Sequence, residues 1–339
     1  MGNEWIYQAA KGFDAHLERE LTLLGPWKKL TTGLYSGPVA PENHYPIWVQ
    51  NIWTAPEILE FTSVKEAAQI LRERQGLWYP YLTIHHRRGA LIQELLPRFR
   101  NKPKPFPYRI PTSNIGAWTL LDEKTLLASP KTTSPFPGGE ALFEENKTDP
   151  PSSAYLKLWE ALSLGGYWKE RELRDNREIT NGGHTSHLTN GGHTSISSLP
   201  GPQDRCLDAG ACPGGWTWVL ANLGAYILAV DRSPLEKGVD LRPEVEFRSG
   251  DGFKITPDRV KREGWEPFTW ILSDMAAYPG KVWDWVELWR ISDPHLKFII
   301  TLKMQGEADW ETMEKFQALP GSHLVHLYNN KHEVTWIKT

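Results

Sequence analysis

Residues 207–216 read LDAGACPGGW and lie where a strand pattern ends and a helical pattern begins. Residues 206–209 have the composition of a buried strand, and residues 216–223 have the pattern of a helix. Glycines at such a turn let the backbone approach a ligand closely, and the first turn of a helix offers unpaired N–H groups. This stretch therefore predicts a strand–loop–helix unit that binds a ligand.

The segments after this loop alternate between strand and helix patterns. Alternation over about 135 residues predicts an α/β domain with a doubly wound, mostly parallel sheet and an antiparallel edge at the end. We expect strands at 226–230, around 247, at 270–272 and 297–302, helices at 282–290 and 310–319, and terminal strands at 323–328 and 334–337.

The first half of the chain has a less regular α+β pattern. A strand is expected at 4–10 and a helix at 13–24, followed by proline-rich loops. A second group of patterns consists of a helix from 64, a strand at 78–84 and a helix at 91–96. Residues 129–153 are rich in Pro, Gly, Ser and Thr, which is typical of a linker between domains. A helix carrying Lys157 is expected at 154–164.

Composition excludes several classes of protein. The 339 residues contain two cysteines, too few for a disulfide framework or a four-cysteine zinc site. The longest apolar stretches fall far short of the ~20 residues of a membrane helix. The N-terminus has no secretory pattern, with Glu4 where a positive charge belongs. We therefore expect a cytoplasmic protein without a membrane partner.

A polar stretch at 171–202 contains an internal duplication. The sequence TNGGHTS occurs at 180–186 and again at 189–195. Two copies are too few for a stacked repeat fold, so we interpret the stretch as a flexible surface insertion. Gly-rich tracts hold histidines loosely, so His184, His187 and His193 do not predict a metal site.

Acidic residues stand at the ends of the expected strands. Asp231 follows Gly210 by 21 residues, and a carboxylate there suits a ribose diol. The glycine spacing is not GxGxxG, and the alternative is an ordinary strand–turn–helix glycine cluster. Asp208 and Asp251 at two further strand ends favour the ligand-binding interpretation. For Asp251, a cap of the following turn is the alternative.

The loop ACPGGW, with Asp208 before it, resembles the S-adenosylmethionine loop of the FtsJ-like ribose 2′-O-methyltransferases. Four further segments resemble the family's catalytic motifs. They are SSAYLKLWEA (152–161), SDM (273–275), ITLKM (300–304) and KHEVTWI (331–337). The resemblance implies a Lys-Asp-Lys-Glu tetrad made of Lys157, Asp274, Lys303 and Glu333.

The M-type large-subunit ribosomal RNA cytidine 2′-O-methyltransferases are the most similar group. They share SPFP (134–137) before the first lysine helix and DGF (251–253) after the second strand. The polar insertion is not part of their pattern. The resemblance implies a ferredoxin-like region at 1–60, a THUMP-like RNA-binding region at 61–133, and a Rossmann-like methyltransferase domain at 134–339.

The same resemblance implies S-adenosyl-L-methionine as cofactor, large-subunit ribosomal RNA as partner, and no metal. For Asp251 it implies a contact to the adenine amino group. The cofactor-binding residues that it implies are Asp208, Gly210, Pro213, Gly214, Gly215, Trp216, Asp231 and Asp251.

The tetrad fits the chemistry of a ribose hydroxyl, which must lose its proton as it attacks a methyl group. A free lysine is protonated at neutral pH, and a second ammonium nearby favours the neutral amine. We hypothesise that Lys303 is the general base, with Asp274 as its nearest partner. Lys157 would position the hydroxyl or tune Lys303, and Glu333 would hold Lys157.

The chain has a net charge of −3, but one run is strongly basic. Between residues 85 and 109, seven Lys and Arg residues stand against one acid. We interpret this run as an RNA-docking surface, with a solvated loop as the alternative. The candidate RNA-binding residues are Arg87, Arg88, Arg98, Arg100, Lys102 and Lys104.

Two other functions stay open from the sequence. An RNA base N-methyltransferase usually carries an Asn/Asp-Pro-Pro-aromatic turn after the fourth strand, where this chain has SDMAAYPG. A non-catalytic RNA-binding or ribosome-assembly protein would keep the fold without the chemistry. Product analysis with labelled cofactor separates these two functions from ribose methylation.

Overall fold

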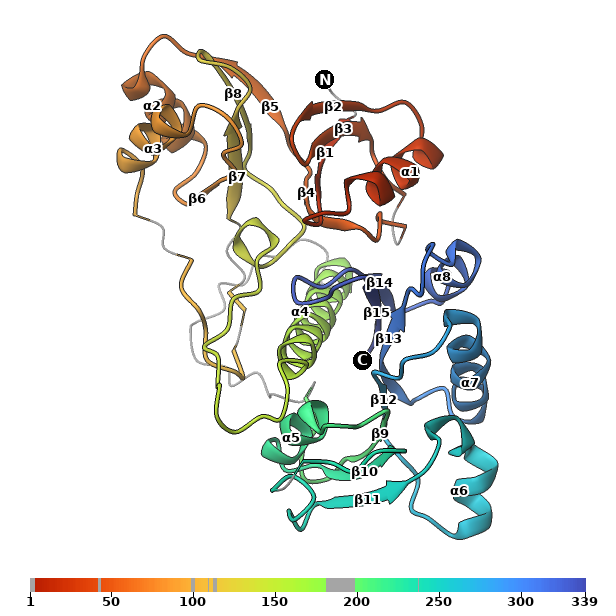
Figure 1. Ribbon diagram of the computed structural model, residues 1–339. Coiled ribbons are helices and arrows are strands. Elements are labelled where there is room, and N and C mark those ends of the chain that lie inside the picture. The colour runs from red at the N-terminus through yellow and green to blue at the C-terminus, as the bar shows by residue number, and fades with distance from the viewer. Residues whose placement is uncertain are drawn as a thin grey trace. The chain divides into compact units, whose positions relative to one another are not determined.

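The computed structural model describes residues 4–41, 44–98, 101–108, 110–111, 115–180, 199–236 and 238–339, with backbone only at 174–180. The chain divides into two compact units, Met1–Glu144 and Glu145–Thr339 (Figure 1). Residues 181–198, and with them most of the duplication and its three histidines, lie outside the described residues, as do Arg100 and Arg109. No helix in the described part of the chain is long and apolar enough to cross a membrane.

The N-terminal unit contains two four-stranded sheets, in the orders β2-β3-β1-β4 and β5-β8-β7-β6. The strands are β1 Glu4–Ala9, β2 Lys28–Thr31, β3 Leu34–Pro38, β4 Val49–Trp53, β5 Glu57–Glu60, β6 Trp78–Pro80, β7 Gly116–Leu120 and β8 Thr125–Ser129. The helices are α1 Asp14–Leu24, α2 Val64–Arg74, α3 His86–Glu94 and the short 3-10 helix η1 Pro137–Gly139.

Local sequence explains how α2 forms and packs. Ser63 caps its first turn by accepting a hydrogen bond from the N–H of Glu66. Ala67, Ala68 and Leu71 share the buried face of the helix. They pack into the apolar core of the second sheet together with the fully enclosed Trp118. The expected division at 1–60, 61–133 and 134–339, and the THUMP-like character of the second region, stay predictions.

The C-terminal unit is built on a seven-stranded sheet in the order β11-β10-β9-β12-β13-β15-β14. Neighbouring strands from β11 to β13 run parallel, and β15 is antiparallel to both β13 and β14. This is the doubly wound Rossmann-like order with an antiparallel edge, so the predicted fold class of this domain is confirmed. The strands are β9 Arg205–Ala209, β10 Tyr226–Asp231, β11 Val245–Ser249, β12 Trp270–Ser273, β13 Lys297–Lys303, β14 His323–Val325 and β15 Glu333–Lys338.

Helices cover both faces of this sheet. Figure 1 shows α4 and α5 on one face and α6, α7 and α8 on the other. The central strands are apolar and fully buried, as expected for strands covered on both sides. The helices are α4 Tyr155–Thr180, α5 Gly215–Asn222, the 3-10 helix η2 Gly252–Lys254, α6 Pro257–Glu263, α7 Pro279–Ser292 and α8 Trp310–Gln317.

Helix α4 is much longer than predicted. The expected end at residue 164 was wrong because the next residue, Gly165, does not stop the helix. A methyl group on Gly165 would lie 2.8 Å from Cγ2 of Thr339, so this glycine serves the close approach of the chain's last residue. Residues 171–180 were expected to begin the insertion, but they are rich in the helix formers Arg and Glu and continue α4.

Two other expectations differ from the structure. The strand predicted at 323–328 ends at Val325, and the chain then turns through 326–332 before β15. Helix α6 was not predicted, although it has a clear start signal. Thr256 accepts a hydrogen bond from the N–H of Arg259, and Pro257 occupies the first position of the helix.

Candidate active site

The edge of the seven-stranded sheet brings three expected catalytic residues together. Asp274 directly follows β12, and Lys303 ends the neighbouring parallel strand β13. Because β15 is antiparallel, its first residue, Glu333, lies at the same edge, in register with Lys303. The carboxyl ends of parallel strands are where open α/β sheets bind ligands.

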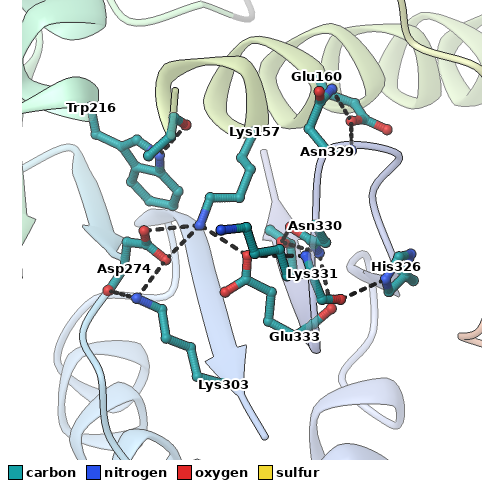
Figure 2. Close-up of polar contacts among 12 residues, drawn as sticks. Lys157, Glu160, Trp216, Asp274, Lys303, His326, Asn329, Asn330, Lys331 and Glu333 are labelled. Carbon is teal, nitrogen blue, oxygen red and sulfur yellow. Dashed lines mark hydrogen bonds and ion pairs between the residues drawn. The ribbon is translucent and has the colours of Figure 1, made fainter. Parts of the chain in front are cut away.

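Lys157 enters this edge from the first turn of α4 (Figure 2). Its Nζ donates to both carboxylate oxygens of Asp274, at 3.0 and 2.9 Å, and to Oε1 of Glu333 at 3.0 Å. The residue is only 8% exposed. Burial alone lowers the pKa of Lys157, but the two carboxylates outweigh it and raise the pKa.

Lys303 meets the same aspartate from another direction. Its Nζ donates to the main-chain oxygen of Asp274 at 2.6 Å and lies 3.3 Å from Oδ1 of the side chain. The Lys303 side chain is 28% exposed, against 10% for that of Lys157. Asp274 thus contacts both lysines, and the four side chains form one cluster of two cations and two anions.

The two lysines differ in what they can still bind. The three N–H donors of Lys157 match the three carboxylate oxygens around it, so this ammonium is held as a fixed charge. Within the described residues, Lys303 makes its polar contacts with Asp274 alone. Lys303 is therefore the lysine that can face a bound hydroxyl group.

The glycine loop lies between β9 and α5, as predicted. Gly210 has φ +83°, and a Cβ there would lie 2.7–2.9 Å from atoms of Met275, the residue after Asp274. Gly214 has φ +116° and precedes the first helical residue, Gly215. Only glycine adopts these angles without strain. Pro213 accepts a hydrogen bond from the N–H of Glu236 through its main-chain oxygen.

Asp231 and Asp251 hold their own loops. The carboxylate of Asp231 accepts from the N–H of Cys212 at 3.1 Å and of Ser233 at 3.0 Å. Asp251 caps η2 through the N–H of Phe253 and pairs with Arg232 at 2.9 Å. Burial raises the pKa of Asp251, but these hydrogen bonds and nearby cations outweigh it and lower the pKa. This geometry agrees with the alternative interpretation of Asp251 as the cap of the following turn. The second carboxylate oxygen, Oδ2, accepts the hydrogen bond from Arg232.

Asp208 is fully buried at the end of β9. Its Oδ2 accepts a hydrogen bond from Oγ1 of Thr217 at 2.6 Å, and its Oδ1 has no partner in the described part of the chain. Burial raises the pKa of Asp208 to about 7. A buried carboxylate oxygen without a partner fits a site that a cofactor's polar group completes.

Trp216 connects the loop to the helix of Lys157. Its indole N–H donates to the main-chain oxygen of Ala154, 2.9 Å away, one residue before α4 begins. A Cβ on Gly215 would lie 2.6 Å from Oγ of Ser152. The loop and the start of α4 are thus packed together, a link that sequence reasoning missed.

The basic run belongs to the N-terminal unit. Arg87 is exposed on α3, and Arg98 and Lys102 are exposed in the following loop. The other two described residues are engaged with rings: Arg88 lies 5.2 Å from the ring centre of Phe61, and Lys104 lies 5.5 Å from that of Tyr108.

Sequence reasoning also missed a polar group behind the tetrad. Glu160, one turn after Lys157 on α4, is 3% exposed and accepts hydrogen bonds from the turn that leads into Glu333. An acid on the otherwise apolar face of the 155–164 segment is the signal that could have found it.

Among the described residues, no group of three or more His, Cys, Asp or Glu side chains is placed to hold a metal ion.

Comparison with known proteins shows which family the C-terminal unit resembles. Residues 192–317 match the model of the family described as FtsJ-like methyltransferase. The C-terminal unit carries an FtsJ-like methyltransferase domain. The matched residues of the FtsJ-like domain include Asp274 and Lys303 but neither Lys157 nor Glu333, which the tertiary structure brings to them.

Two curated relatives are named ribosomal RNA large subunit methyltransferase M, from Shewanella pealeana and Aromatoleum aromaticum. Each is 32% identical to this chain, over 143 and 141 residues. The matches cover 39% of this chain but only 38% and 36% of the relatives, so the chain spans less than two fifths of their length. Fibrillarin of Aeropyrum pernix, solved with bound S-adenosyl-L-methionine, is 18% identical over 41% of this chain and 68% of that chain, with a TM-score of 0.34.

Proposed function

We propose that this protein transfers a methyl group from S-adenosyl-L-methionine to a ribose 2′-oxygen of large-subunit ribosomal RNA. The observation that carries the proposal is the meeting of Lys157, Asp274, Lys303 and Glu333 at one edge of an FtsJ-like domain. The names of the two curated relatives support large-subunit ribosomal RNA as the substrate. A cytoplasmic location is part of the same proposal.

The cofactor supplies an electrophilic methyl group on a positively charged sulfur when it is bound. The residues of this chain that fit it are the unpartnered Oδ1 of Asp208, the carboxylate of Asp231 and the N–H groups at the start of α5. Gly210 and Gly214 give the loop the positive φ angles with which it leads from β9 into α5. The remaining proposed cofactor contacts come from Pro213, Gly215, Trp216 and Asp251.

In the proposed reaction, Lys303 is the general base. Its neutral amine takes the proton of the 2′-hydroxyl while the oxygen forms its bond to the methyl carbon and the carbon–sulfur bond breaks. Asp274 orients Lys303 through its main-chain oxygen and its carboxylate. Lys157, fixed between Asp274 and Glu333, supplies a positive charge beside the attacking oxygen.

The basic run of the N-terminal unit is the proposed RNA-docking surface. Arg87, Arg98 and Lys102 are exposed to solvent, where they can contact the phosphates of an RNA. Arg88 and Lys104, which lie over aromatic rings, are the other described members of the proposed set. Arg100 completes the proposed set from the sequence.

The decisive experiment follows labelled methyl groups into RNA. The protein is incubated with methyl-labelled S-adenosyl-L-methionine and either naked large-subunit RNA or large ribosomal subunits, and the RNA is digested to nucleosides. We expect a 2′-O-methylnucleoside. A base-methylated nucleoside would establish the alternative enzyme class, and no label in either substrate, with cofactor binding intact, would leave an RNA-binding or assembly protein.

A further inference from the structure

Glu160 occupies a central position in the C-terminal unit that the proposed chemistry does not use. It lies three residues after Lys157 on α4, and residues at this spacing share one face of a helix. The side chain is enclosed, with the whole residue 3% exposed. Figure 2 shows Lys157 directed to the tetrad and Glu160 directed to the turn before β15.

Three N–H donors converge on the Glu160 carboxylate. Oε1 accepts from the main-chain N–H of Tyr328 at 2.8 Å. Oε2 accepts from the main-chain N–H of Asn329 at 3.1 Å and from its Nδ2 at 2.9 Å. A buried carboxylate is costly unless it is hydrogen bonded, and here amides alone satisfy it. This pairing binds two successive peptide groups of the turn to α4.

The turn that Glu160 holds, residues 326–332, leads directly into Glu333. Bonds within the turn give it its shape. Nε2 of His326 pairs with the main-chain oxygen of Lys331 at 2.9 Å. Nδ2 of Asn330 donates to the main-chain oxygen of Glu333 at 3.2 Å and to Oγ1 of Thr335 at 3.1 Å. These hydrogen bonds link the turn to the start of β15, and Glu160 links the turn to the helix that carries Lys157.

We propose that Glu160 is a positioning residue that fastens the 326–332 turn to α4 and so sets Glu333 against Lys157. The proposal rests on the proposed function for its effect on catalysis. Glu160 acts through Glu333, since its hydrogen bonds within the described residues go to Tyr328 and Asn329 and none to the tetrad. Loss of this tether leaves the tetrad chemically complete but looser.

The first test reads the tether itself and needs no activity. Amide hydrogen exchange is measured at Tyr328 and Asn329 in the wild-type chain and in Glu160→Gln, which keeps the size of the side chain but turns one acceptor into a donor. We expect ~10-fold faster exchange at these two amides, the size of one lost hydrogen bond. The amides of β15, held by β13, stay as protected as in the wild type.

Glu20 provides a matched control in the other unit. It is a helical glutamate of similar burial that accepts from two successive main-chain N–H groups, those of Ile47 at 2.7 Å and Trp48 at 3.0 Å. In Glu20→Gln, exchange at Tyr328 and Asn329 stays as in the wild type. Unchanged exchange at these two amides in Glu160→Gln would overturn the tether.

The second test measures methyl transfer in a single turnover with saturating RNA, per cofactor-binding site. We expect Glu160→Ala to slow the step up to ~100-fold, since small misplacements of catalytic groups have effects of this size. Affinity for S-adenosyl-L-methionine stays near the wild-type value, which a general loss of folding would not produce. Glu160→Gln is expected between the wild type and Glu160→Ala.

A double-mutant cycle with Glu333→Gln decides whether Glu160 acts through Glu333. If it does, Glu160→Ala slows the Glu333→Gln variant much less than it slows the wild type. Independent effects, in which the two losses multiply, would overturn the proposal. If the wild type transfers no methyl group to any RNA, the proposed function fails by itself, and the exchange measurement alone then decides the tether.

Discussion

At the scale of single residues, two lysines share Asp274 but occupy different surroundings. Lys157 is enclosed and bound by two carboxylates, whereas Lys303 reaches Asp274 from a partly exposed position. A fixed ammonium provides charge, and only an amine that can lose its proton provides a base. In the proposed reaction, Lys157 would therefore supply the charge and Lys303 the base.

Replacing Lys303 by alanine tests its role as base. We expect Lys303→Ala to abolish methyl transfer, because no other described lysine meets Asp274 from the exposed side. Binding of S-adenosyl-L-methionine, measured by calorimetry, is expected to persist because the glycine loop is untouched. Methyl transfer at the wild-type rate by this variant would reject the assignment.

Removing Lys157 should affect stability as well as activity. Lys157→Met leaves the mostly buried Glu333 without its cation, and Asp274 keeps only the more distant ion pair with Lys303. We expect the free energy of unfolding to fall by about 3 kcal/mol, as when one partner of a buried ion pair is lost. Urea unfolding at neutral pH measures this change.

Lys315 is the matched control for that measurement. It pairs with Glu311 on the surface of α8, where the two side chains are 45% and 81% exposed. Lys315→Met should change the free energy of unfolding by less than about 1 kcal/mol. Equal losses for the two variants would show that the Lys157 cluster is no more than a surface ion pair.

At the scale of elements, the β9–α5 loop is shaped by backbone angles and close approach. Gly210 combines a positive φ with a close approach to Met275, so the glycine loop lies against the residue that follows Asp274. Trp216 joins the same loop to the start of α4. Lys157 and Asp274 are thereby placed relative to the loop through residues near them in the sequence, Ala154 and Met275.

The Gly210→Ala variant, compared with a second glycine variant, separates the effect of the positive φ from that of the close approach to Met275. The added methyl group would meet main-chain atoms of Met275 at 2.9 Å, so we expect weaker cofactor binding and a lower free energy of unfolding. Gly264→Ala at the end of α6 has a similar φ of +68° with open space around it, and should cost only about 1 kcal/mol. Similar losses in both variants would show that the approach to Met275 contributes nothing.

At the scale of the whole molecule, buried carboxyl groups connect stability to pH. Burial raises the pKa of both Asp208 and Glu160 to about 7. In the unfolded chain these groups release their protons near pH 4. Between about pH 4 and pH 7 these two groups therefore bind more protons in the native state than in the unfolded chain, and their contribution to the free energy of unfolding falls as pH rises.

The pH prediction is checked by urea unfolding between pH 4 and pH 8. Each of the two carboxyl groups lowers the free energy of unfolding by up to roughly 1.4 kcal/mol per pH unit in this window. In Glu160→Gln the decline should be shallower, because that side chain no longer titrates. A decline as steep as in the wild type would contradict the raised pKa of Glu160.

RNA binding by the basic run should depend on its exposed charges. Charge reversal at the exposed Arg98 and Lys102 should weaken RNA binding and flatten its dependence on salt, since fewer phosphate contacts release fewer counterions. Lys65→Glu, an equally exposed change on α2, is the control. RNA affinity is measured by filter binding across salt concentrations, and an unaltered salt slope would remove this run from the interface.

The strands, the glycine loop and the α/β class of the C-terminal unit could be predicted from the sequence alone. These features depend on local signals: apolar runs, glycines at turns, and charged residues where strands end. The order of Lys157, Asp274, Lys303 and Glu333 along the chain was also readable, through resemblance. Helix α4 ran past its predicted end at Gly165, where the missing side chain leaves room for Thr339, a residue far away in the sequence.

The side-chain contacts among these residues, in contrast, depend on the tertiary structure. The antiparallel register that places Glu333 opposite Lys303, and the sharing of Asp274 by two lysines, follow from strand order in space. The attachment of the 326–332 turn to Glu160 joins residues 168 and 169 positions apart. Side-chain contacts across such separations arise when helices pack on a sheet, and no pattern within a short window of sequence contains them.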